Sequence, residues 1–252
     1  MKSFPLLRTR RLTVKLKELS IGAAISLANM PAHMEESMRT EFLRHTVDTV
    51  QSGSENVTDW TVQERVMAVA HYLASVMPDG PDFSLGAGNY SDYLDGAADI
   101  SIAMNRISIG EVGGDNWEIQ HLTGAMAESI ERLSGEFDQL SPRLHWIIGA
   151  MAAQLIRVGE TPPDLSSDGL YDEWLLSRIQ VFMEFPESDF EQLMAAYSIG
   201  RKNLHHLFAY SFDDYGMVIL PKTGGTEGLP SARFPVRSAI SRMALDMEGK
   251  PG

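Results

Sequence analysis

The sequence predicts an α+β protein with a mainly helical body and short antiparallel β elements at the N-terminus, in the middle and near the C-terminus. Most apolar residues recur every three or four positions, which is the spacing of helices with one buried face. Three short stretches instead alternate apolar and polar residues or collect β-branched and aromatic ones, as strands do. With 252 residues, 44% of them hydrophobic, the chain can form one large domain or two ordinary ones.

The first predicted elements are a strand followed by a helix. Residues 12 to 16, LTVKL, alternate in the manner of a half-buried strand, and Ser20 can cap the apolar helix IGAAISLANM, which ends before Pro31. Pro31 fits the first turn of a second helix that should continue to the break at residues 51 to 53. Its expected apolar face is formed by Met34, Met38, Phe42, Leu43 and Val47.

The segment WTVQERVMAVAHYLASVM, residues 60 to 77, holds several ionisable groups inside an apolar helical pattern. Thr61 and Glu64 have the spacing of a capping box, in which each side chain binds the other residue's backbone amide. His71 lies two helical turns after Glu64 and has no second histidine at the spacing of a zinc helix. We therefore favour a hydrogen-bonded packing role for His71 over a catalytic one.

Residues 78 to 115 are rich in Gly, Asp, Pro and Ser, which predicts turns. Ile100 to Met104 and Ile107 to Val112 could pair as a hairpin across Asn105-Arg106. The aspartates of this region do not have the spacing of a calcium-binding loop, and its glycines do not form a dinucleotide-binding loop. The acids concerned are Asp79, Asp82, Asp92 and Asp95, and we expect them to cap solvated turns.

Helices are expected again from Trp117, and Ser141-Pro142 should begin the most buried of them, RLHWIIGAMAAQLIRV. The Pro- and Gly-rich loop at residues 158 to 169 is the best candidate boundary. The predicted division is an N-terminal part, 1–158, and a C-terminal part, 159–252, unless the chain is one continuous domain.

The C-terminal part should contain a helix from Tyr171 to Phe185 and a second capping box at Ser188 and Glu191. The segment LHHLFAYSFDDYGMVILP then predicts two strands around an Asp213-Asp214 turn, and Val236 to Met247 predicts a terminal amphipathic helix. His205 and His206 are adjacent, so on a strand they would face opposite sides and could not bind one metal ion.

Composition excludes several functions and disfavours others. The absence of cysteine excludes disulfides, thiol catalysis and thiolate metal sites. No run of about 18 apolar residues or signal peptide is visible, so we expect neither a membrane span nor secretion. No catalytic, cofactor-binding or metal-binding constellation is evident, and we do not expect an enzyme. A carboxylate- or histidine-based hydrolase using Glu64, His71, Glu128 or Glu131 is the alternative.

The net charge of -13 is unevenly distributed. Residues 1 to 17 contain six basic groups and no acid, whereas residues 18 to 200 contain 8 basic and 29 acidic groups, a balance of -21. Such an acidic body would repel nucleic acid. The basic arm could bind the protein's own middle or an acidic neighbour, or it could serve solubility alone.

Three stretches together resemble a known family. They are LTVKLKELSIGAAISLANMP, WTVQERVMAVAHYLA and FPESDFEQLMAAYSIGRKNLHHLFAYSFDDYGMVILP. In this order they resemble proteins encoded among the tail genes of bacteriophages, in the baseplate or tail hub assembly group. The resemblance covers both ends of the chain and rests on packing residues. Some relatives have cysteine pairs in the terminal β element, which this chain lacks.

The resemblance implies a non-enzymatic role in building the tail tip, as a structural subunit or an assembly chaperone. The implied partners are other tail or baseplate proteins, or further copies of the chain, in the host bacterial cytoplasm or in the virion tail. An acidic, host-directed mimic of nucleic acid is a further alternative. The contact residues expected in the arm and in the late strand are Arg8, Arg10, Arg11, Lys15, Lys17, Phe208, Tyr210 and Phe212.

Overall fold

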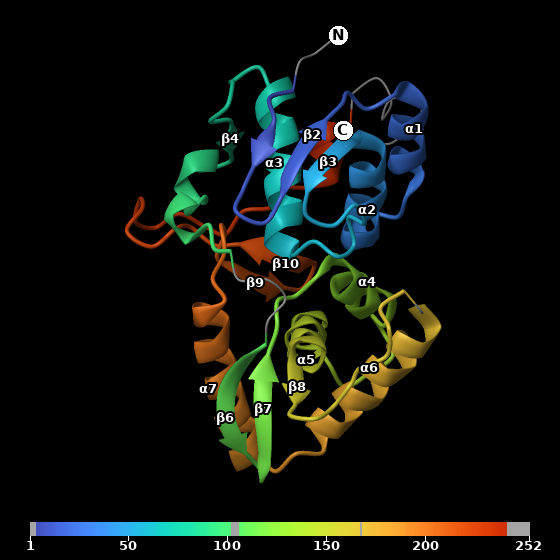
Figure 1. Ribbon diagram of the computed structural model, residues 1–252, viewed down its shortest axis with the longest axis vertical. Helices are drawn as coiled ribbons and strands as arrows, with labels where there is room; N and C mark the ends of the chain where they lie inside the picture. Colours follow the sequence, from blue (N-terminus) through green and yellow to red (C-terminus); the bar gives the residue numbers. More distant parts are fainter. Residues whose placement is uncertain (1–3, 102–105, 167, 241–252) are drawn as a thin grey trace. The chain divides into compact units, whose positions relative to one another are not determined.

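The computed structural model describes residues 4–101, 106–166 and 168–240, and it confirms the α+β prediction (Figure 1). The α-helices of this part of the chain are α1 (Ile21–Asn29), α2 (Glu35–Thr46), α3 (Val62–Val76), α4 (Gly124–Arg132), α5 (Pro142–Gln154), α6 (Asp168–Met183) and α7 (Glu187–Asn203). The strands are β1 (Leu7–Arg8), β2 (Thr13–Leu16), β3 (Val47–Ser52), β4 (Ser84–Leu85), β5 (Gly88–Asn89), β6 (Ile107–Val112), β7 (Asp115–Ile119), β8 (Leu155–Arg157), β9 (Tyr210–Asp213) and β10 (Gly216–Ile219). Short 3-10 turns lie at Tyr90–Asp92, Gly96–Ala98 and Val236–Ala239.

The chain forms two compact units that do not follow the predicted division. The first unit combines Met1–Ser101 with His206–Ser211 and Met217–Gly252, and the second unit combines Ile102–His205 with Phe212–Gly216. The loop at residues 158 to 169, which the sequence favoured as a boundary, lies inside the second unit.

The first unit is built on an antiparallel sheet of β1, β2 and β3, seen beside α2 and α3 in Figure 1. Val14 and Leu16 on β2 are buried, whereas Lys15 between them is exposed, as the alternating sequence predicts. The expected helix through residue 51 is wrong in its second part. α2 ends at Thr46 because the β-branched residues that follow it pair as β3 with β2, Val50 opposite Val14 and Thr49 opposite Lys15.

The second unit contains the sheet β6-β7-β8. β6 pairs with β7, and most of the first strand of the predicted hairpin, residues 102 to 104, lies outside the described residues. Gly113 and Gly114 both have positive φ, 63° and 82°, and so supply the tight turn that joins β6 to β7. Trp117 therefore lies in a strand, and Leu155–Arg157 leaves α5 to form β8.

Helix α7 belongs to the second unit and approaches β6 and β7 closely at Gly200. A Cβ atom there would meet Ile109 at 2.8 Å and Ile119 at 2.9 Å, so glycine allows this contact. The capping box expected at Ser188 and Glu191 is wrong, because α7 begins at Glu187 with Pro186 in the cap position. Proline fixes an extended backbone two residues before the predicted cap, which places Ser188 inside the first turn.

The end of the chain matches the prediction in part. β9 and β10 pair across the Asp213-Asp214 region as expected. The expected helix from Val236 to Met247 is replaced at its start by the short 3-10 turn Val236–Ala239, and residues 241 to 252 lie outside the described part.

Candidate functional site

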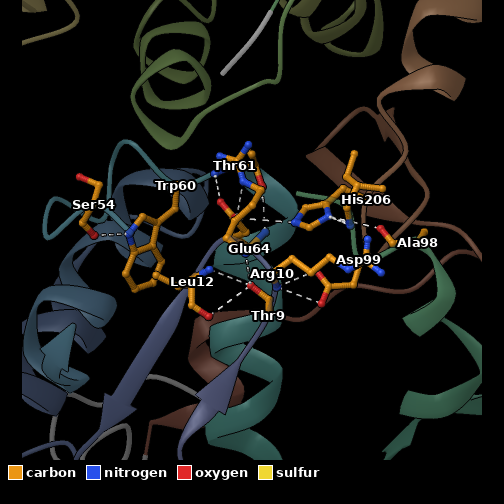
Figure 2. Close-up of polar contacts among 12 residues, drawn as sticks. Thr9, Arg10, Leu12, Ser54, Trp60, Thr61, Glu64, Ala98, Asp99 and His206 are labelled. Carbon is orange, nitrogen blue, oxygen red and sulfur yellow. Dashed lines mark hydrogen bonds and ion pairs between the residues drawn. The ribbon is translucent and has the colours of Figure 1, made fainter. Parts of the chain in front are cut away.

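The capping box at the start of α3 is present in both halves. The Thr61 amide donates to Glu64 Oε2 at 2.9 Å, and the Glu64 amide donates to Thr61 Oγ1 at 3.1 Å. Figure 2 shows this pair at the centre of a group of polar contacts in the first unit. The sequence therefore predicted the local role of Glu64 correctly.

Glu64 also has two long-range partners that its local role did not reveal. Arg11 Nε donates to Glu64 Oε1 at 2.8 Å, and His206 Nε2 lies 3.6 Å from the same oxygen (Figure 2 labels His206). The carboxylate and the imidazole are almost fully buried, at 3% and 0% exposure of their side chains. One carboxylate thus joins the β1-β2 turn, the start of α3 and the segment that re-enters the first unit at residue 206.

The environment of Glu64 determines its protonation. Burial by itself would raise the pKa of Glu64, but the His206 side chain, the charge of Arg11 and the Thr61 amide together lower this pKa to about 2. Glu64 is therefore a carboxylate at neutral pH. A group with so low a pKa is a poor proton donor or acceptor for reactions near pH 7, which suits a structural ion pair better than general acid-base catalysis.

The loop at residues 98 to 100 contacts the other ring nitrogen of His206. The Ile100 amide donates to His206 Nδ1 at 3.2 Å, and the Ala98 carbonyl lies 3.3 Å from the same nitrogen. Leu207 follows with φ of 59°, a left-handed conformation that is uncommon for a bulky residue. The two histidines thus lie outside any strand, contrary to prediction, and the sequence carried no local sign that His206 would meet Glu64.

The other residues of the hydrolase alternative are His71 in the first unit and Glu128 and Glu131 in the second. His71 Nε2 lies 2.8 Å from the carbonyl oxygen of Pro5, which is the hydrogen-bonded packing role that the sequence favoured. Glu128 and Glu131 are on α4, which belongs to the second unit, with Glu131 buried and Glu128 half-buried. Within the first unit, the groups brought to Glu64 are instead Arg11 and His206.

From residue 4 onwards, the predicted arm contributes β1 and β2 to the β1-β2-β3 sheet. Arg8, Arg10, Lys15 and Lys17 have exposed side chains, and no ion pair among the described residues includes them. The Arg10 backbone amide donates to both carboxylate oxygens of Asp99, at 3.1 and 3.0 Å, which fixes the turn (Figure 2). Arg11 differs because Glu64 engages it and its side chain is only 13% exposed.

The late-strand aromatics are core residues, which corrects their expected role as surface contacts. Phe208, Tyr210 and Phe212 are 0%, 8% and 4% exposed. In the first unit, Phe208 packs against Phe234 with ring centroids 5.8 Å apart, and in the second unit Phe212 stacks on Trp146 at 5.7 Å. Residues of β9 alternate between buried and half-buried, and its aromatic side chains lie on the buried side.

The turn acids behave as predicted where the structure describes their contacts. Asp82 accepts hydrogen bonds from the amide and hydroxyl of Ser91, at 2.7 and 2.9 Å, and Asp92 accepts from the Asn89 amide at 2.9 Å. Within the described residues, no group of three or more His, Asp or Glu side chains is arranged to hold a metal ion.

The described helices are also too short or too polar to span a bilayer. Comparison of the chain with protein-family models, curated proteins and solved structures gives no match.

Proposed function

We propose that this chain is a non-enzymatic bacteriophage tail tip or baseplate protein that acts in tail assembly through contacts with other tail proteins. The sequence resemblance supplies the phage context. The structural observation that carries the proposal is the group of four exposed cations on and beside the β1-β2-β3 sheet, without ion pairs among the described residues. These are Arg8, Arg10, Lys15 and Lys17.

The contrast with the interior of the first unit supports a binding role. Glu64, Glu36 and Arg65 are buried and engaged in contacts between separate segments, so their charges serve the fold. The four surface cations make no such contribution, and isolated surface charges affect stability little. Charges of this kind steer association and fix its register, which are the properties that an assembly protein requires.

The proposed setting is the cytoplasm of the host bacterium during tail assembly. A structural subunit would afterwards stay in the particle, whereas an assembly chaperone would leave it. The four cations are exposed, so other tail proteins and further copies of the chain could both reach them.

Co-purification with the tail proteins of the same phage tests the proposal. An affinity-tagged chain is produced together with these proteins, one at a time, and the retained protein is identified by mass spectrometry. At least one tail protein should be retained at low salt and reduced at high salt, because exposed charges are screened. If none is retained and the chain is also missing from purified particles, the proposed function is wrong.

Mass spectrometry of purified particles then separates the two forms of the proposal. Recovery of the chain in the particle indicates a structural subunit. Retention of a tail protein during co-purification, with no chain in the particle, indicates an assembly chaperone.

A further inference from the structure

We infer that the exposed side of the β1-β2-β3 sheet binds an acidic, extended segment of a partner tail protein. The inference rests on the proposed function and adds to it the chemistry of the partner and the way it binds. The basic face is defined here as Arg8, Thr13, Lys15, Lys17, Thr49 and Ser52.

The register of the sheet places these residues on one side. Lys15 and Lys17 flank the buried Leu16, so their side chains share the exposed side, about 7 Å apart along the strand. Arg8 is opposite Thr13, which is two residues before Lys15. The three cations therefore follow one another along the face at a spacing that matches acidic residues at alternate positions of an extended chain.

Hydroxyl groups occupy the positions between and beside the cations. Thr13 lies opposite Ser52 and Lys15 lies opposite Thr49, and residues directly opposite in an antiparallel pair share a face. Ammonium and guanidinium groups only donate hydrogen bonds, and hydroxyls can donate as well. Carboxylates only accept, so an acidic segment complements this whole set of side chains.

The edges of the sheet do not favour addition of another strand. The pairing of β3 with β2 is irregular at two places, between Thr13 and Val14 and between Lys15 and Leu16. Such bulges twist an edge and interrupt its row of amide and carbonyl groups. Asp48 is exposed on β3 and would repel an acidic strand there, and β1 has only two residues. The partner segment therefore lies on the exposed face of the sheet and does not pair with its edge.

Charge also distinguishes a protein segment from nucleic acid. Residues 18 to 200 have a net charge of -21. A nucleic acid duplex carries about one negative charge per 1.7 Å of its length, so this acidic part of the chain would repel it. A short acidic peptide can stay within the roughly 8 Å over which physiological salt leaves charges unscreened. The basic face is small enough to suit only the peptide.

Binding of a defined probe to the full chain tests the inference. The probe is a fluorescent peptide that alternates Glu and Thr, and its control has the same composition with all Glu residues in one block. The alternating peptide should bind more tightly, and its fluorescence anisotropy should fall as salt is added. Equal binding of both peptides, or binding that salt does not change, would overturn the proposed spacing.

Two charge-reversal variants provide the matched comparison. Lys15→Glu/Lys17→Glu alters the basic face, and Arg143→Glu/Lys202→Glu alters exposed cations on α5 and α7. Each double substitution changes the net charge by -4, from -13 to -17. The first variant should weaken peptide binding by about tenfold or more, because attraction becomes repulsion, and the second should bind as the unaltered chain does. Circular dichroism confirms that both are folded.

Other occupants of the face give different results, each of which contradicts the inference. A DNA duplex that displaces the peptide at equal charge concentration would identify nucleic acid. Self-association that is lost in Lys15→Glu/Lys17→Glu, without peptide binding by the unaltered chain, would identify a second copy. If Lys15→Glu/Lys17→Glu still co-purifies with a tail protein as well as the unaltered chain, the binding face is elsewhere although the proposed function stands.

Discussion

The two units of this protein bury charged side chains in different ways. In the first unit, Arg65 is 0% exposed and lies among groups from α2: it donates to the Glu36 carbonyl oxygen at 2.8 Å and to Thr40 Oγ1 at 2.6 Å. Its Nη1 is 3.6 Å from the Glu36 carboxylate, which also pairs with Arg39. Together with the Glu64 cluster, this arrangement balances buried charge with opposite charge.

In the second unit, Arg178 is surrounded mainly by carbonyl groups and aromatic rings. Its guanidinium donates to the carbonyl oxygens of Ala152, at 2.9 Å, and Leu155, and to Glu160 Oε1. The same group lies over Trp174, 4.9 Å from the ring centroid. The buried charge of Arg65 is therefore balanced by a buried acid, whereas that of Arg178 depends more on carbonyl dipoles, packed rings and the partly exposed Glu160.

The largest expected effect is that of Arg65→Met, which keeps a long side chain but removes its charge. Glu36 would remain buried with less compensation, and loss of one member of a buried ion pair costs about 3 to 5 kcal/mol. Urea unfolding measures the change, with the fluorescence of buried Trp60 reporting on the first unit. A loss below about 1 kcal/mol would show that the ion pairs of the first unit contribute little.

The second prediction concerns Glu64→Gln and pH. The pKa of Glu64 is lowered in the folded state, from 4.5 to about 2, so its contribution is complete above about pH 5 and is lost as pH falls towards 2. A shift of this size corresponds to about 3 kcal/mol at pH 7. The unaltered chain should therefore lose stability on acidification, and the variant should start lower and lose less.

Glu55→Gln is the control for this experiment, since Glu55 is an exposed carboxylate of the same unit. It should leave both the stability at pH 7 and its pH dependence nearly unchanged. Unfolding by urea at several pH values gives the comparison. Parallel pH profiles of Glu64→Gln and the unaltered chain would exclude Glu64 as the source of acid sensitivity.

The smallest expected effect is that of Arg178→Lys in the second unit. Lysine retains the positive charge but not the planar fork that contacts two carbonyls, a carboxylate and a ring, so we expect a loss of about 2 kcal/mol. Arg157→Lys is the matched control, because Arg157 is 40% exposed although it also lies near Trp117. Urea unfolding should show little change for Arg157→Lys, and equal losses for both variants would contradict this account.

Local chemistry made part of this structure predictable. The caps at Ser20, Thr61 and Ser141 are present, each side chain accepting from an amide three residues later. These signals depend on residues within one turn, so the sequence contains all that is needed to recognise them. The turn role of Asp92, which accepts from the Asn89 amide three residues before it, is local in the same way. The packing role of His71 was also predicted, but its partner, the Pro5 carbonyl 66 residues away, was not.

The missed features depend on residues far apart in the chain. The sequence predicts β8 as the end of helix α5, because only its pairing with Trp117, Glu118 and Ile119 makes it a strand. His206 meets Glu64 across 142 residues, so no spacing rule applies to it. The burial of Phe208 and Phe212 likewise depends on rings from other segments. Propensity describes a segment, whereas these features belong to the assembled unit.

The position of the second unit in the chain has a consequence for synthesis. Because this unit interrupts the first one between Ser101 and His206, a ribosome must produce more than half of the protein after α3 before His206 can reach Glu64. Val236, whose amide donates to Glu35 Oε1, arrives later still. The unit begun first is therefore the last to become complete, and until then a nascent chain exposes the part of α3 that the turn Val236–Ala239 later covers.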